Sequence, residues 1–246
     1  MKLNRLGWLL GLAVMLTGSR VMAAGEFEGE LDMKMSSGNA EKSMVMQYFV
    51  KGHKMRSQAS SEDGKFSGGA IIDFQTHQMI MVMDKQKMYM VSKLNSEAFT
   101  PKKDNHFKIT KTGNTQTILG YSCREWDYTS DDNSGKMWFA SGIGNWWANS
   151  MAAQSKNLTS DQKAMVNLVL SEKLFPMKWE STGKDGNVRG SSEVVKIEKK
   201  SLDSSLFSPP AGYKKFNMPD FGGMGDGSGK KPSKEDLMKM MEQFKK

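Results

Sequence analysis

Polar and apolar residues alternate over much of the chain, which predicts a protein built mainly of β-strands. The first alternating run is EFEGELDMKM at residues 26–35, where polar and apolar residues largely hold opposite parities. Such a run is typical of a strand with one face in water and one face in a core. Pairing it across the polar loop 36–43 with the run 44–50 puts three facing pairs on one side: Met35 with Met44, Met33 with Met46, and Leu31 with Tyr48.

A second hairpin is predicted in residues 79–91, MIMVMDKQKMYMV. A tight turn within residues 84–87 aligns the methionines of the two halves in facing positions. The opposite face is apolar too, so we expect this hairpin to be central in the sheet and covered on both sides. One face then holds Met79, Met81, Met83, Met88 and Met90, and the other holds Ile80, Val82, Tyr89 and Val91.

Short strands separated by turns continue along the chain and predict an antiparallel meander. Two helices are expected between them, at 145–156 and 161–172, the second with Ser160 as its N-cap and Met165, Leu168 and Val169 on one face. Their position favours packing on the concave side of a curved sheet. The further strands are expected at 54–59, 68–74, 107–112 and 115–119 about a Gly113-Asn114 turn, 122–128, 136–140, 175–182 and 187–199.

Both ends of the chain differ from this pattern. Residues 1–24 combine early positive charge, an apolar run and small residues at Ala23 and Ala24, as a cleaved secretory signal peptide does. No later run is long enough to span a membrane, so we expect a periplasmic or secreted protein without an integral membrane segment after cleavage. One domain is expected over 25–220, a Gly-rich linker over 221–233 and an amphipathic helix over 234–246.

Charge and chemistry narrow the function. The net charge of +8 falls to 8 − 3 = +5 without the signal peptide and is spread along the chain, which argues against a nucleic-acid partner. Cys123 is the single cysteine, so no intrachain disulfide forms. A thiol buried in a strand is the favoured expectation, and dimer formation and metal ligation are the alternatives. The carboxylates sit in turns or at strand ends, and no nucleophile elbow or phosphate-binding glycine loop occurs. We therefore expect neither an enzyme nor a cofactor.

Five segments resemble a bacterial exported family catalogued as domain of unknown function 4412: VKGHKMR (50–56), AIIDF (70–74), MIMVMDKQKMYMV (79–91), TILGYSCREW (117–126) and LDSSLFSPPAGYKK (202–215). The presumed architecture of this family is similar to that of the periplasmic lipoprotein carriers LolA and LolB. The resemblance implies a mainly β (α+β) fold, in which a curved antiparallel sheet forms an incomplete barrel and helices cover an apolar concave side. The linker and terminal helix are not part of that pattern.

The methionines, 22 in the chain, have two compatible interpretations. Thioethers fill irregular gaps in ordinary cores, and they also line sites that adapt to variable apolar partners. We expect a half-barrel cavity for a lipid or lipidated protein, in which the Trp146-Trp147 pair either anchors a helix or forms a hinged lip. The predicted cavity residues are Leu31, Met33, Met35, Met44, Met46, Tyr48, Met79, Met81, Met83, Met88, Met90, Trp146 and Trp147.

Two alternatives use the same sequence differently. His77 shares the parity of Met79 and Met81, and imidazole with thioethers suits Cu(I) or Ag(I), so a periplasmic metal-binding protein is the first alternative. The second is an interaction module with no small ligand. In either case the terminal helix 234–246 is expected to dock on its own domain or on a protein partner.

Overall fold

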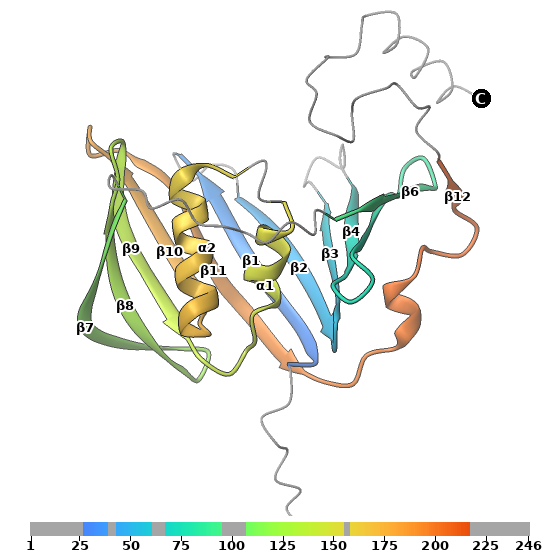
Figure 1. Cartoon of the computed structure of the whole chain (residues 1–246), viewed down its shortest axis with the longest axis horizontal. Helices are drawn as coiled ribbons and strands as arrows, with labels where there is room; N and C mark the ends of the chain where they lie inside the picture. The colour runs from blue at the N-terminus through green and yellow to red at the C-terminus, as the bar shows by residue number, and fades with distance from the viewer. Residues whose placement is uncertain (1–26, 39–42, 61–66, 95–106, 155–157, 217–246) are drawn as a thin grey trace, which may run out of the picture.

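The structure is a computed structural model that describes residues 27–38, 43–60, 67–94, 107–154 and 158–216. Its strands form one twelve-stranded sheet in the order β12-β6-β5-β4-β3-β2-β1-β11-β10-β9-β8-β7 (Figure 1). The strands are β1 (Gly29–Ser37), β2 (Ser43–Lys51), β3 (Lys54–Ser60), β4 (Ser67–Asp73), β5 (Gln78–Met83), β6 (Met88–Lys93), β7 (Lys108–Ile118), β8 (Tyr121–Thr129), β9 (Asn133–Ala140), β10 (Phe175–Gly183), β11 (Val188–Lys199) and β12 (Lys214–Lys215).

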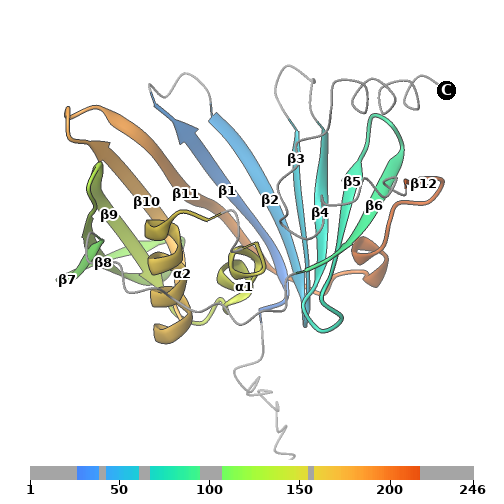
Figure 2. The same cartoon turned by 45° about the horizontal axis from the view of Figure 1, so that its top comes forward.

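Two antiparallel meanders build the sheet. Strands β1 to β6 follow one another in space, as do β7 to β11, and the antiparallel pair β1–β11 joins the two series. Among the described strands, only β12 runs parallel to its neighbour, β6. The sheet curves and stays open between its two ends (Figure 2). The predicted curved antiparallel sheet is confirmed.

The predicted register is confirmed in both methionine hairpins. Strand β1 pairs with β2 so that Met35 faces Met44, Met33 faces Met46 and Leu31 faces Tyr48. Strand β5 pairs with β6 through Met83 and Met88 and through Met81 and Met90. Hydrophobic parity is sufficient here because a shift of one residue would move every apolar side chain to the other face.

Four local predictions are wrong. The hairpin 79–91 lies next to the sheet edge and not at its centre, because only the two-residue β12 follows β6. Residues 107–119 do not form a hairpin about Gly113-Asn114; the register shift between Lys111 and Thr115 is absorbed within the single strand β7. The first helix, α1 (Trp146–Ala152), is shorter than expected. The second, α2 (Ser160–Glu172), is capped by Thr159 and not Ser160.

The Thr159 cap has a clear cause. Its side chain accepts a hydrogen bond from the backbone N–H of Gln162, and the Gln162 side chain accepts one from the backbone N–H of Thr159. This capping box satisfies two backbone donors at once, whereas Ser160 has no equivalent partner three residues on.

Both helices lie on the concave side of the sheet, as predicted, α2 over β9 to β11 and α1 over β1 and β2 (Figures 1 and 2). Helix α2 buries Val166 and Val169 against Trp126, Met137 and Phe139 of the sheet. Helix α1 contributes Trp146 to a second cluster. That cluster, called here the α1 cluster, has as buried members Phe27, Leu31, Met33, Val50, Met55, Ile72, Leu94, Ile118, Cys123, Trp138, Ala140, Ile143, Trp146, Phe175, Met177 and Val194.

The convex side of β3 to β6 is covered by residues 200–216, called here the strap. Its short 3-10 helix η2 (Ser204–Phe207) places Phe207 against Ile71 and Val82. Tyr213 Oη donates a hydrogen bond of 2.9 Å to Asp84 Oδ1, and Phe216 N donates one of 2.7 Å to Tyr89 O. The β5–β6 hairpin therefore has its packing partner on the convex side.

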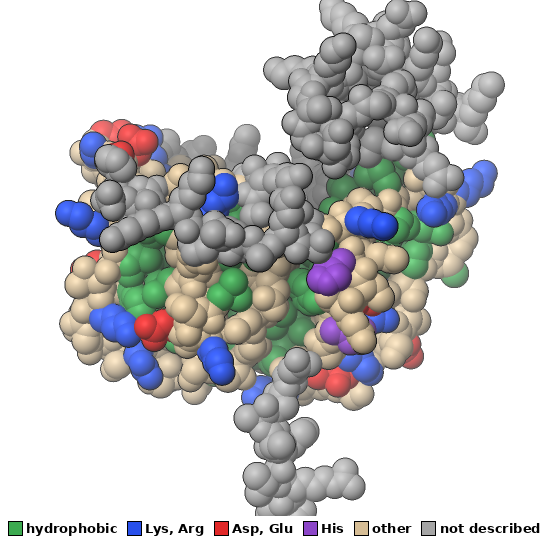
Figure 3. Space-filling view, viewed as in Figure 1, with side chains coloured by type: hydrophobic (Ala, Val, Ile, Leu, Met, Phe, Trp, Pro, Cys, Tyr) green, Lys and Arg blue, Asp and Glu red, His purple; other side chains and the backbone are tan. Residues whose placement is uncertain are grey.

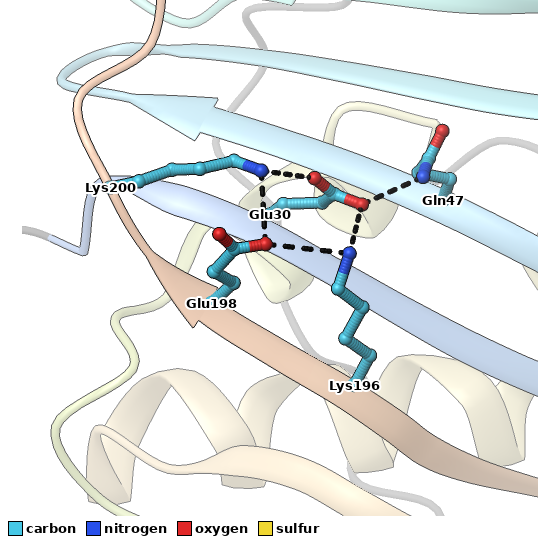
Figure 4. A network of polar contacts seen from close by, with 5 residues as sticks. All are labelled: Glu30, Gln47, Lys196, Glu198 and Lys200. Atoms are coloured by element: carbon cyan, nitrogen blue, oxygen red, sulfur yellow. Dashed lines mark hydrogen bonds and ion pairs between the residues drawn. The ribbon is translucent and has the colours of Figure 1, made fainter.

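A polar network ties β1, β2 and β11 together on the same convex side (Figure 4). The buried Glu30 carboxylate accepts hydrogen bonds from Lys196 Nζ at 2.8 Å, Lys200 Nζ at 2.7 Å and Gln47 Nε2 at 2.8 Å. The hydrogen bonds from Lys196 and Lys200 hold the pKa of Glu30 below its ordinary value, so the carboxylate stays ionised. The joint between the two meanders is therefore held by charge as well as by strand pairing.

Candidate functional site

The candidate site is the part of the concave side that lies beyond α1, on β2 to β6. The register places its residues in two cross-strand rows. One row is Met46, Ala59, Gly68, Met83 and Met88; the other is Ser57, Ala70, Met81 and Met90, with Tyr48 at its β2 end. We call this surface the methionine face and define it as Met44, Met46, Ser57, Ala59, Gly68, Ala70, Met81, Met83, Met88 and Met90.

Small residues separate two groups of methionines on this face. Met44 and Met46 lie on β2, and four methionines lie on β5 and β6. Between them β3 and β4 carry only Ser57, Ala59, Gly68 and Ala70. Three strand spacings of about 4.8 Å put β2 and β5 roughly 14 Å apart. The backbone of β3 and β4 is thus flanked by long flexible side chains and bears short ones.

On strands β1 to β6 this side of the sheet bears no charge. Along the described strands β1 to β6, every residue whose parity matches the methionine face is uncharged, although 25% of the chain is Asp, Glu, Lys or Arg. The charged residues of these strands take the opposite parity. They are Glu30, Asp32, Lys34, Lys51, Lys54, Arg56, Asp73 and Lys93.

The thirteen predicted cavity residues fall into two sets. Seven belong to the α1 cluster or pack against it and so serve as core: Leu31, Met33, Met35, Tyr48, Met79, Trp146 and Trp147. None of the three hydrophobic clusters formed by the described residues contains the other six. These six are Met44, Met46, Met81, Met83, Met88 and Met90.

The six methionines outside the clusters are accessible to different degrees. Met81 is 43% exposed and Met44 is 38% exposed, while the others are half-buried. Hydrophobic side chains show at the surface on this side of the molecule (Figure 3). A core methionine such as Met33, at 5% exposure, contrasts with them. Core packing accounts for Met33, whereas none of the clusters of described residues accounts for these six.

Trp146 is an anchor. Its ring centroid lies 5.3 Å from that of Tyr48 and 5.0 Å from that of Phe175, and its Nε1 donates a hydrogen bond to Ile143 O. Only 6% of the residue is exposed. Large aromatic side chains bury much apolar area, and a ring held on three sides cannot swing as a lip. Trp147 is half-buried and packs between the two helix clusters.

Two polar groups border the site on the concave side. Burial raises the pKa of Tyr48 to about 12, so its hydroxyl stays neutral. Ser92, opposite Met79 on β6, has a buried Oγ without a hydrogen-bond partner among the described residues. A buried hydroxyl without a partner is a free donor and acceptor for a bound group.

The predicted His77 site does not hold in its original form. His77 lies in the turn before β5 with a φ of 53°, so the strand parity that grouped it with Met79 and Met81 does not reach it. The described residues contain no cluster of three His, Cys, Asp or Glu side chains that could hold a metal. Cys123 is fully buried, and burial raises the pKa of its thiol, so it stays protonated and inert.

The fold and the site together define an open, curved antiparallel sheet with two helices and an uncharged face on its concave side. The chain belongs to the family described as Domain of unknown function (DUF4412), which matches residues 27–213. The predicted family resemblance is confirmed. No curated protein sequence matches this chain.

Several solved structures are similar to this one. An uncharacterized conserved protein from Thermus thermophilus shares 8% identity over 77% of this chain and 90% of its own, with a TM-score of 0.44. The matching chain in the MucA/MucB complex of Pseudomonas aeruginosa shares 8% identity over 76% of this chain and 57% of its own, with a TM-score of 0.41. A domain from Vibrio parahaemolyticus is described as that of a putative outer membrane lipoprotein-sorting protein. It shares 9% identity over 76% of this chain and 90% of its own, with a TM-score of 0.30.

Among the described residues, no helix is both long enough and apolar enough to cross a membrane. The expected signal peptide, linker and terminal helix lie outside the described residues.

Proposed function

We propose that this protein is an exported, non-catalytic binding protein whose methionine face holds an apolar ligand, a lipid or the acyl chain of a lipidated protein. The observation that carries the proposal is the set of six methionines that lie outside the hydrophobic clusters of the described residues, on the side of β1 to β6 that bears no charge. The sequence of residues 1–24 supports export.

The shape of the methionine face suits a linear apolar chain. Short side chains on β3 and β4 leave room for a ligand next to the sheet, but Ala59 and Gly68 are buried. The methionines on both sides therefore have to turn aside, and their three side-chain torsions allow them to follow the contour of the ligand. Burying about ten methylene groups contributes on the order of 8 kcal/mol before the cost of association is subtracted. Micromolar binding needs about 8 kcal/mol net, so a longer chain or additional contacts are required.

Ser92 offers a hydrogen-bond partner for a polar headgroup on this side of the sheet. Ser92 Oγ is buried and without a partner among the described residues, and Ser92 is the next residue on the same face of β6 after Met90. A ligand carboxyl or hydroxyl bonded to it would remove the cost of leaving that hydroxyl unsatisfied, which is about 1–3 kcal/mol. A fatty acid or acyl-glycerol therefore fits better than a pure hydrocarbon.

The test is to block the face between the methionine groups. In Ala70→Phe a large ring occupies the strip of small residues, and we expect binding of the fluorescent apolar probe 1-N-phenylnaphthylamine to weaken by at least about tenfold, or 1.4 kcal/mol. The matched control is Thr117→Phe, which adds the same ring at an exposed position of β7. Circular dichroism and urea denaturation establish that both variants fold.

Undiminished probe binding by a folded Ala70→Phe variant would refute this site. Equal losses in Ala70→Phe and Thr117→Phe would do the same. Competition of the probe by palmitate, and weaker competition in Ser92→Ala, would identify the acyl chain and its headgroup contact.

A further inference from the structure

The β5–β6 hairpin carries four thioethers in a compact arrangement. Met81 pairs directly with Met90, and Met83 pairs directly with Met88. Facing Cβ atoms in an antiparallel pair lie about 5 Å apart, and residues two apart along a strand lie roughly 6.7 Å apart. The four Cβ atoms therefore stand at the corners of a rectangle that one ion could occupy above its centre.

The geometry points to a soft-metal site: we propose that Met81, Met83, Met88 and Met90 bind one Cu(I) or Ag(I) ion through their sulfur atoms. Thioether sulfur is a soft ligand that selects Cu(I) over harder ions such as Zn²⁺, Ni²⁺ and Mg²⁺. Methionine has three flexible torsions, so four side chains that start at these positions can turn their sulfurs toward a common point. This site differs from the His77 grouping because all four ligands lie on paired strands.

The hydrophobic clusters of the described residues do not account for these four methionines. The hairpin is held through its other face, where Ile80 and Val82 belong to the cluster that includes the strap residue Phe207. Met81 is 43% exposed, and the four methionines belong to none of the clusters of described residues. Leucine or valine would satisfy the need for apolar character at such positions with better-defined rotamers. A sulfur atom is what the four positions have in common.

The neighbouring positions of β3 and β4 are uncharged, whereas Lys214 of β12 lies in register with Met88 at the sheet edge. The strip residues Ala59, Gly68 and Ala70 bring no charge or competing ligand. Met79 precedes Met81 on the same face of β5 but packs against the α1 cluster, and Met44 and Met46 stand on the far side of the strip. An all-thioether site does not change charge with pH, because no ligand carries a titrating proton. Binding should therefore persist at acidic pH, where histidine and thiolate sites release their metal.

The experiment uses the full mature chain and a Cu(I) competition titration against bathocuproine disulfonate, repeated with Ag(I) and followed by native mass spectrometry. We expect one ion per chain in the wild type. The double variant Met81→Leu/Met90→Leu keeps the face apolar and should bind Cu(I) at least about tenfold more weakly. The matched control Met44→Leu/Met46→Leu removes two methionines from the same face and should bind as the wild type does.

Absence of Cu(I) and Ag(I) binding by the wild type would overturn the site, as would unchanged affinity in Met81→Leu/Met90→Leu. Equal loss in the Met44→Leu/Met46→Leu control would overturn its placement on the hairpin. This result can be told apart from the test of the apolar ligand, because leucine keeps the face apolar. The wild type and both double variants are also titrated with 1-N-phenylnaphthylamine in the absence of metal. Wild-type affinity that stays constant from pH 7 to pH 5 distinguishes thioether ligands from histidine.

Discussion

The rings of Tyr48 on β2 and Trp146 on α1 lie with their centroids 5.3 Å apart. This contact fixes the first helix on the sheet beside the methionine face and makes Trp146 part of the core. The helix therefore forms one boundary of the face.

Replacing Trp146 with alanine should destabilise the protein strongly. The ring is almost fully buried between Tyr48 and Phe175, and removing a buried aromatic side chain costs about 3–5 kcal/mol. Urea denaturation of both tryptophan variants provides the measurement. Trp147→Ala, at a half-buried position, should lower the free energy of unfolding by less. An equal or larger decrease in Trp147→Ala would contradict the anchor role of Trp146.

The Glu30 network should make stability depend on pH in the acid range. The folded-state pKa of Glu30 is lowered from its ordinary 4.5, chiefly by the hydrogen bonds from Lys196 and Lys200. A lowered pKa stabilises the folded protein above the ordinary value, and this contribution disappears as the pH falls through the folded-state pKa. Glu30→Gln should therefore cost about 2 kcal/mol at neutral pH, and the difference from the wild type should shrink below pH 4.5.

Chemical denaturation of the wild type and Glu30→Gln at several pH values between about 3 and 7 gives the difference in their free energies of unfolding at each pH. Glu198→Gln is the control, because the more exposed Glu198 shares Lys196 and Lys200 and is screened by water. Its effect should be clearly smaller. A difference for Glu30→Gln that grows toward low pH would have the wrong sign.

The strap should be required for the stability of the β5–β6 hairpin. Phe207 is 5% exposed and packs on Ile71 and Val82, so Phe207→Ala should cost about 3–4 kcal/mol. Hydrogen exchange should show the loss first in the amides of β5 and β6. If the amides of β7 to β11 lost their protection from exchange as early as those of β5, the strap would not have a local role in stabilising the hairpin.

The β7–β8 turn offers a stabilising substitution. Leu119 and Gly120 both have positive φ, 49° and 82°, as a tight two-residue hairpin turn requires. Leucine is strained there, whereas asparagine tolerates the left-handed region, so Leu119→Asn should raise the free energy of unfolding by about 1 kcal/mol. Thermal denaturation measures the gain. A lower melting temperature would contradict the strain argument.

Much of the fold follows from parity in the sequence. Runs such as 26–35 and 79–91 define faces and registers because one-residue slips are so costly. The turn predicted at Gly113-Asn114 is wrong for a physical reason. A Gly-Asn pair is a common turn sequence, but here both residues lie within β7, where the register with β8 shifts between Lys111 and Thr115. The position of the hairpin near the edge depends on the β1–β11 contact, which joins residues far apart in the sequence.

The candidate site could be predicted only in part. Methionine parity identified its walls, but it did not separate core residues such as Met33 from accessible ones such as Met81. That distinction depends on where α1 ends and what it covers. The sequence analysis does not predict the strip of small residues. The signal for it is in the sequence, because alternate positions of two adjacent expected strands are all small: Ser57, Ala59, Gly68 and Ala70.

The most direct test of the apolar-ligand account is photo-crosslinking of the full mature chain with a diazirine-bearing palmitate, followed by peptide mass spectrometry. The two faces supply a matched comparison, since Met44 and Met81 are 38% and 43% exposed on the concave side and Val45 and Val91 are 46% and 36% exposed on the convex side. We expect adducts on Met44, Met81 and their neighbours on β2, β5 and β6, and their loss with excess unlabelled palmitate. Adducts at Val45 and Val91 in equal or greater yield would contradict it.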